Sequence, residues 1–233
     1  MNRTANVIRM QLVNRQTFVW LPATILGAAF AITLAIYGVV VYTAGSADEP
    51  MYSGGTQAPL WYFGVVGVQA LTLTFPFSQA MSVTRREFFL GTLLTAAASA
   101  GVLALVYLVG GILEQATDGW GFGGYFFYLP WVWEQGPIVA ALTFFSAAAL
   151  AFLVGFGSAT VYKRFGMFGV ILVGVVLAAA LIGTAFAVSA VDGWPAIGRA
   201  LAAAQPLTVA GICLAVSAAV AGLSYAALRR AIP

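Results

Sequence analysis

The sequence predicts an all-α membrane protein with six transmembrane helices, an N-terminal interfacial helix, a short cytoplasmic helix and a short outer helix between spans five and six. Three observations predict this fold. Only 7% of the residues are charged and 62% are hydrophobic, whereas soluble domains carry about 25% charged residues. Six apolar stretches reach the roughly 20 residues that a helix needs to cross a bilayer. Almost all basic residues fall on one side of the resulting topology.

The six spans are expected at about residues 20–43, 59–80, 92–113, 137–160, 167–190 and 206–228. A β-barrel would instead show segments of roughly ten residues with alternating polarity. Proline falls in the first turn of four of these helices, where a missing N–H is tolerated (Pro22, Pro59, Pro137 and Pro206). Pro76 lies inside the second span and predicts a kink or the end of its regular part. Residues 20–233 are thus one transmembrane domain.

The distribution of charge predicts the orientation of the chain. One side carries Arg3, Arg9, Arg15, Arg85, Arg86, Lys163, Arg164, Arg229 and Arg230, and the other carries only Arg199. Loops rich in Arg and Lys stay in the cytoplasm, so both termini are expected there. The acids Asp48, Glu49, Glu114, Asp118, Glu134 and Asp192 then lie outside. Alanine-rich composition, with arginine favoured over lysine, fits a bacterial protein of the inner (cytoplasmic) membrane.

Three further segments have predicted structures. Residues 1–19 mix apolar and arginine residues, as in a helix lying at the inner headgroups, although a disordered basic tail is the alternative. Residues 114–136 are rich in glycine and aromatic residues and predict an anchored lid or a short interfacial helix. Residues 191–205 predict a short outer helix with Pro195 in its first turn. Rows of small residues, such as Ala147, Ala151, Gly155 and Ala159, predict close helix packing.

The charged stretch between spans two and three has helical local chemistry. Thr84 and Glu87 have the spacing of a capping box, and Gly91 is placed to end a short helix. Phe88 and Phe89 follow the charges directly. We therefore expect a very short amphipathic helix at the cytoplasmic face. An ordinary basic loop with phenylalanines in the headgroups explains the same residues.

This stretch, SVTRREFFLG at 82–91, together with the order of the other elements, resembles the permease subunits of ABC-2 type ABC transporters. In that family the loop after the second span forms a coupling helix that docks on the ATPase subunit. The resemblance implies ATPase-coupling roles for Thr84, Arg85, Arg86, Glu87, Phe88 and Phe89. It implies the same for Lys163 and Arg164 in the second inner loop, although basic-loop topology explains that pair equally well.

The resemblance also implies the partners and the cargo. The expected partners are a separate ABC ATPase, which holds ATP and Mg, and a second permease in a homodimer or a heterodimer, with no cofactor on this chain. In related permeases helices two and five line the dimer interface. The polar residues of these helices are therefore candidates for the transport pathway: Gln69, Thr72, Thr74, Ser78, Gln79, Thr184 and Ser189. Hydrogen bonds between helices explain them as well. A hydrophobic or amphipathic cargo, such as a peptide, drug or lipid, is expected to be exported.

Other classes of function fit the sequence less well. The chain has no histidine, so it lacks the usual base of a serine protease and the usual ligand of a haem. The phosphate-binding motif GxxxxGK[ST] is absent because the only lysine, Lys163, follows Tyr162. We therefore expect that the chain is not itself an enzyme and binds no nucleic acid. The alternative function is a non-transporting membrane anchor or assembly subunit of a multiprotein complex.

Overall fold

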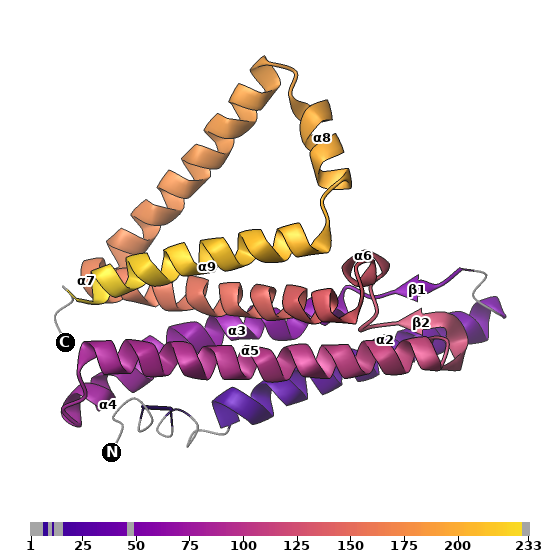
Figure 1. Cartoon of the computed structure of the whole chain (residues 1–233), viewed down its shortest axis with the longest axis horizontal. Coiled ribbons are helices and arrows are strands. Elements are labelled where there is room, and N and C mark those ends of the chain that lie inside the picture. The colour runs from indigo at the N-terminus through magenta and orange to yellow at the C-terminus, as the bar shows by residue number, and fades with distance from the viewer. Residues whose placement is uncertain (1–6, 9–10, 12–15, 46–48, 230–233) are drawn as a thin grey trace.

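The computed structural model describes residues 7–8, 11, 16–45 and 49–229, which form a bundle of long helices (Figure 1). Among these residues, five helices are long and apolar enough to cross a membrane: Gln16–Ala44, Gly55–Ala80, Arg85–Ala116, Pro137–Ala190 and Pro206–Leu228. The all-α membrane class is therefore confirmed. Most of the predicted interfacial segment 1–19 lies outside the described residues, as do Arg3, Arg9, Arg15, Asp48 and Arg230.

The first two long helices match the predicted spans closely. The π-helical turn η1 (Gln16–Trp20) continues into α2 (Leu21–Ala44). After β1 (Met51–Tyr52) and η2 (Gly55–Gln57), α3 (Ala58–Gln69) continues through the π-helical turn η3 (Ala70–Thr74) into α4 (Phe75–Ala80). The disturbance expected at Pro76 is this π-helical turn, which interrupts the regular hydrogen bonds just before the proline.

The separate short coupling helix is not found. Instead, α5 (Arg85–Ala116) runs without interruption for 32 residues, and Gly91 lies inside it. A glycine inside a helix costs only about 1 kcal/mol relative to alanine, which is too little to end a helix whose neighbours Phe88 and Phe89 are buried in the bundle. The predicted short helix is therefore the first two turns of α5.

The long loop after α5 folds onto the end of the bundle. It contains the turn η4 (Gly119–Gly123), β2 (Gly124–Tyr125) and α6 (Pro130–Trp133). The pairing of β2 with β1 is parallel, with Met51 opposite Gly124 and Tyr52 opposite Tyr125; the sequence did not predict it. Phe126 and Trp133 are buried, so this loop, which we call the lid, is anchored to the bundle. It also contains a short helix, α6, so features of both sequence alternatives are present.

The helix α7 (Pro137–Ala190) contains both stretches that were expected as spans four and five. Its 54 residues change direction at Gly166, whose φ of 70° and ψ of −169° are not helical (Figure 1). A positive φ favours glycine, so this residue permits the reversal. Counted as one helix, α7 gives five membrane-length helices among the described residues rather than six. The chain continues through the predicted short helix, α8 (Trp194–Ala202), into α9 (Pro206–Leu228).

The first half of α7 is the centre of the bundle and packs against α3, α5 and α9. Two of these contacts bring backbones together. A Cβ atom added at Gly155 of α7 would lie 1.9 Å from the carbonyl oxygen of Gly64 in α3, and one added at Gly67 would lie 2.0 Å from that of Phe152. Gly155 belongs to the row of small residues expected to allow such packing.

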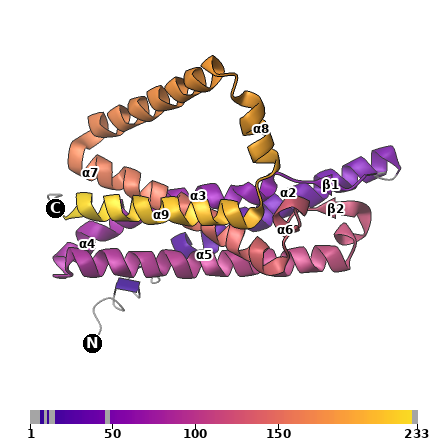
Figure 2. The same cartoon turned by 45° about the horizontal axis from the view of Figure 1, so that its top comes forward.

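The second half of α7 stands apart from the bundle and is joined to α9 by α8 (Figure 2). Residues 171–184 are exposed without exception, and they include large apolar side chains such as Leu181, of which 71% is exposed. Because no described part of the chain packs on this stretch, its apolar surface is left to lipid or to another protein.

Candidate functional site

Five of the six described basic residues gather at one end of the bundle, where α5 begins, α7 turns and α9 ends (Figure 1). We call this the basic end; it carries Arg85, Arg86, Lys163, Arg164 and Arg229. The lid and α8, which carries Arg199, lie toward the opposite end. The separation of charge seen along the sequence is therefore kept in space.

The predicted capping box at the start of α5 is present. The hydroxyl oxygen of Thr84 accepts a hydrogen bond from the backbone N–H of Glu87 at 3.3 Å. In return, the backbone N–H of Thr84 donates to Oε2 of Glu87 at 3.0 Å. Two N–H groups that a helix start normally leaves unpaired are thus satisfied, which holds the first turn of α5 in one conformation.

Phe88 and Phe89 attach this first turn to the bundle. Phe88 is fully buried and packs edge-on against Phe75 of α4, with 5.1 Å between the ring centroids. Phe89 lies 4.9 Å from the ring of Tyr225 in α9. Their side chains therefore lie inside the protein, not among lipid headgroups, and they pack the start of α5 against both α4 and α9.

Arg85 makes a second connection to α9. Its Nη1 donates to the backbone carbonyl oxygens of Leu228 at 3.3 Å and Arg229 at 2.9 Å. A cation at the last carbonyls of a helix is favourable because these groups lack partners within the helix and carry its negative dipole end. The neighbouring Arg86 is exposed. One arginine of the pair is therefore structural, and the other is open to a partner.

The second predicted contact region lies close by. Lys163 and Arg164 are exposed just before the turn of α7 at Gly166. Arg164 and Arg229 both line a cavity of about 530 Å³, whose other lining residues belong to the last turns of α9. Because Arg229 also accepts the bond from Arg85, α9 brings the two predicted coupling regions together, although they are far apart in the sequence.

The candidate pathway residues of the second span do not form one polar face. Thr72 and Ser78 donate to carbonyls of their own helix, Val68 at 2.9 Å and Phe75 at 2.7 Å. Gln79 donates to the carbonyl of Val83 at 3.1 Å. Gln69 and Thr74 border a common space, a cavity of about 40 Å³ that they share with Gln11, Thr17 and Phe18.

The candidates of the fifth span lie elsewhere, on the half of α7 that stands apart. Thr184 is exposed and donates to the carbonyl of Leu181 at 2.8 Å. Ser189 accepts a bond from Nε1 of Trp194 at 2.9 Å. The single chain therefore does not bring the two sets of candidate residues together.

Glu114 has an environment that the sequence analysis did not predict. It was expected on the outer side with the other acids, and it lies at the end of α5 opposite the basic end, but its side chain is fully buried. Oε1 accepts bonds from Nε1 of Trp120 and the N–H of Phe126, both at 2.9 Å. Oε2 accepts from the N–H groups of Phe127 at 2.7 Å and Tyr128 at 2.8 Å. The only feature of the sequence that could have indicated this burial is the position of Glu114 at the end of an apolar run, directly before a glycine-rich loop.

Comparisons with protein-family models, curated proteins and solved structures find no match for this chain. No family is therefore identified by similarity. The structure establishes a multi-pass helical membrane protein with five candidate spans among its described residues.

Proposed function

We propose that this chain is the membrane subunit of an ATP-driven transporter of the ABC-2 type. In this proposal it exports a hydrophobic or amphipathic cargo, and a separate ATPase supplies the energy. The observation that carries the proposal is the start of α5, which is basic, capped and tied to two other helices. A rigid element of this kind can pass a movement at the membrane surface into the spanning helices.

The length of α5 supports a helix start that projects from the bilayer. At about 1.5 Å per residue its 32 residues extend roughly 48 Å, whereas the hydrocarbon core is about 30 Å thick. Several turns must therefore lie outside the hydrocarbon. Burying Arg85 and Arg86 at the bilayer centre would cost about 3 kcal/mol each, so the turns at the basic end are the ones that project.

We further propose that α7 crosses the membrane twice, which gives six spans. Residues 137–165 and 167–190 each exceed the roughly 20 residues that a crossing requires. Lys163 and Arg164 directly precede the turn at Gly166, and two adjacent cations are expected at a membrane surface rather than inside the bilayer. The basic end would then face the cytoplasm of a bacterial cell.

The exposed second half of α7 supports a second permease in the assembly. Packing there would cover its apolar side chains and give Thr184 and Ser189 a partner surface. This second subunit can be another copy of the chain or a related one. In the assembly, the exposed Arg86, Lys163 and Arg164 would contact the ATPase, and the buried Phe88 and Phe89 would transmit its movement.

The test is to purify the tagged chain from the membranes of its own cells in mild detergent and to measure ATP hydrolysis in the complex. We expect Arg86→Glu to lower the co-purified hydrolysis about tenfold, equivalent to roughly 1.4 kcal/mol of binding. Arg199→Glu is the matched control because this arginine is exposed on α8, and it should change nothing. A complex without hydrolysis, or equal hydrolysis in both variants, would refute the proposal and favour a non-transporting anchor.

A further inference from the structure

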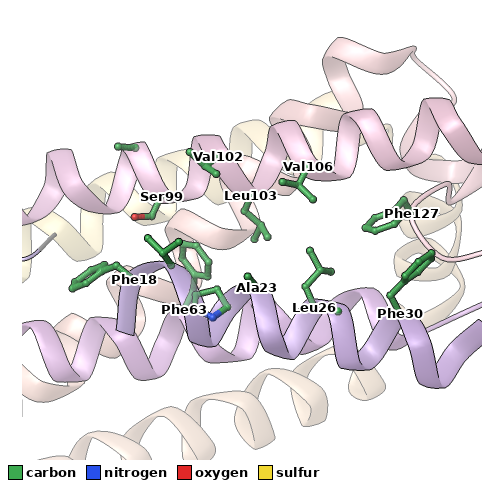
Figure 3. Close-up of a pocket in the computed structure, with 14 residues that line it drawn as sticks. Phe18, Ala23, Leu26, Phe30, Phe63, Ser99, Val102, Leu103, Val106 and Phe127 are labelled. Carbon is green, nitrogen blue, oxygen red and sulfur yellow. The ribbon is translucent and has the colours of Figure 1, made fainter. Parts of the chain in front are cut away.

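A cavity of about 570 Å³ lies between α2 and α5 (Figure 3). Of the 14 residues that line it, only Ser99 has a polar side chain. The volume is within the roughly 300 to 1,000 Å³ of typical ligand sites. An ordered water needs two to four polar partners, so an apolar space of this kind is not a water site.

The cavity is elongated along the helices. Phe18 lies at one end, and Phe30 and Phe127 lie at the other (Figure 3). The rise along the chain from Phe18 to Phe30 is roughly 18 Å at 1.5 Å per residue, close to the ~15 Å of one leaflet's hydrocarbon. The far end is closed by aromatic rings, because Phe30 packs 5.3 Å from Trp120 and 5.4 Å from Phe127.

The side of the cavity opens between the two helices. Gly27 on α2 and Ala98 on α5 are exposed, and 63% of Val102 is exposed. Both helices are membrane-spanning by length and composition, so the medium at this opening is hydrocarbon. A flexible chain can enter sideways and gain contacts with the apolar walls.

The end near Phe18 offers hydrogen bonds. Phe18 also borders the cavity of about 40 Å³ that Gln11, Gln69 and Thr74 line. Gln11 is 1% exposed and donates through Nε2 to Thr92 at 2.7 Å, but its buried Oε1 has no partner. The large cavity is therefore apolar and closed at the Phe30 end, and beyond Phe18 at its other end lies a buried amide oxygen without a partner.

We propose that this space binds one acyl chain of a membrane phospholipid. The methyl end lies against Phe30 and Phe127, and the polar end of the lipid lies on the Phe18 side, which is also the side of the unpaired amide oxygen of Gln11. The lipid belongs to the leaflet at the basic end, where α5 begins. This inference needs only the bundle and the bilayer and does not rest on the proposed transport function.

The first experiment fills the cavity. A Cβ atom built at Gly27 would have no other atom within 4 Å, and the same holds for Gly38 on the same helix, which does not line the cavity. Both Gly27→Leu and Gly38→Leu improve helix propensity, so they form a matched pair. Phospholipid that remains bound in mild detergent is counted by native mass spectrometry of the full chain.

We expect wild type and Gly38→Leu to retain one phospholipid per chain and Gly27→Leu to lose at least about 90% of it, a tenfold change in occupancy. Ala98→Leu, on the opposite wall of the cavity, should have the same effect. It replaces Gly27→Leu in the experiment if that variant does not fold. Equal retention in all folded variants, or no retained lipid in wild type, would overturn the proposal.

A second experiment locates the chain. The protein is reconstituted in vesicles of phosphatidylethanolamine and phosphatidylglycerol whose acyl chains carry a photoreactive group near the methyl end. Adducts are expected on Phe30, Val106 and Phe127, and they should disappear in Gly27→Leu but not in Gly38→Leu. Adducts confined to outward-facing residues such as Ile112 would show that the lipid contacts only the outer surface of the protein. This result would count against a defined site.

Discussion

Replacing Glu114 by glutamine is expected to loosen the lid. The carboxylate accepts four hydrogen bonds, two at each oxygen, from Trp120 and from three successive backbone N–H groups that begin at Phe126. Glutamine puts an NH₂ group in place of one oxygen. Because that group is a donor facing two donors, Glu114→Gln loses at least two of the four bonds and leaves buried N–H groups unpaired.

The magnitude follows from the bonds lost. Hydrogen bonds to a charged group contribute about 1.5 to 3 kcal/mol each, so losing two costs about 3 to 6 kcal/mol. A neutral amide is easier to bury than a carboxylate, which offsets part of this cost and favours the lower value. A loss of about 3 kcal/mol lowers the melting temperature by roughly 6 to 12 °C for a chain of this length.

The assay is thermal unfolding of the purified chain in one detergent, combined with hydrogen exchange at the amides of Phe126, Phe127 and Tyr128. These three amides should exchange faster in Glu114→Gln. Glu134→Gln is the control, because Glu134 is an exposed acid of the same loop. A melting temperature within 2 °C of wild type, with unchanged exchange, would refute the reasoning that this carboxylate holds the lid.

Three further predictions concern the packing and the basic end. Gly155→Val should destabilise the bundle by about 1 to 3 kcal/mol through overpacking, as measured by thermal unfolding. Gly174→Val, on the open half of α7, is the control and should not destabilise it. Equal destabilisation by the two variants would contradict the close approach of α3 and α7. Arg85→Gln should speed hydrogen exchange in the last turn of α9, since it weakens the bonds to Leu228 and Arg229, and Arg199→Gln should leave this exchange unchanged. Thr84→Ala should lower the free energy of unfolding by about 1 kcal/mol and speed hydrogen exchange at the start of α5. Thr84→Ser keeps the capping hydroxyl and should do neither. Similar exchange rates in the two variants would contradict the capping role of Thr84.

Much of the secondary structure could be predicted because its causes are local. The predicted last span, 206–228, coincides with α9, and the first, second and short outer helices also lie where expected. The capping box needs only a hydroxyl and a carboxylate three residues apart. Gly91 misled the prediction because the sequence does not show that Phe88 and Phe89 are buried on the bundle, which keeps α5 continuous through the glycine.

The candidate site could be predicted only in part. Sequence analysis placed Arg85, Arg86, Lys163 and Arg164 on one side, and the structure gathers them at one end. It could not separate Arg85, which binds α9, from the exposed Arg86. The ATPase-coupling and pathway roles of these residues stay predictions.

Composition and local chemistry alone determined that this protein is helical, lies in a membrane and has a capped, basic helical turn between its second and third long apolar stretches. These properties follow from the apolar content, the length of each run and the spacing of neighbouring residues. The tertiary structure decided the buried carboxylate under the lid, the connection between the ends of α5 and α9, and the apolar cavity between α2 and α5. Each of these depends on groups far apart in the chain, such as Arg85 and Leu228, which are separated by 143 positions. Their contact is produced by packing, which no local pattern encodes.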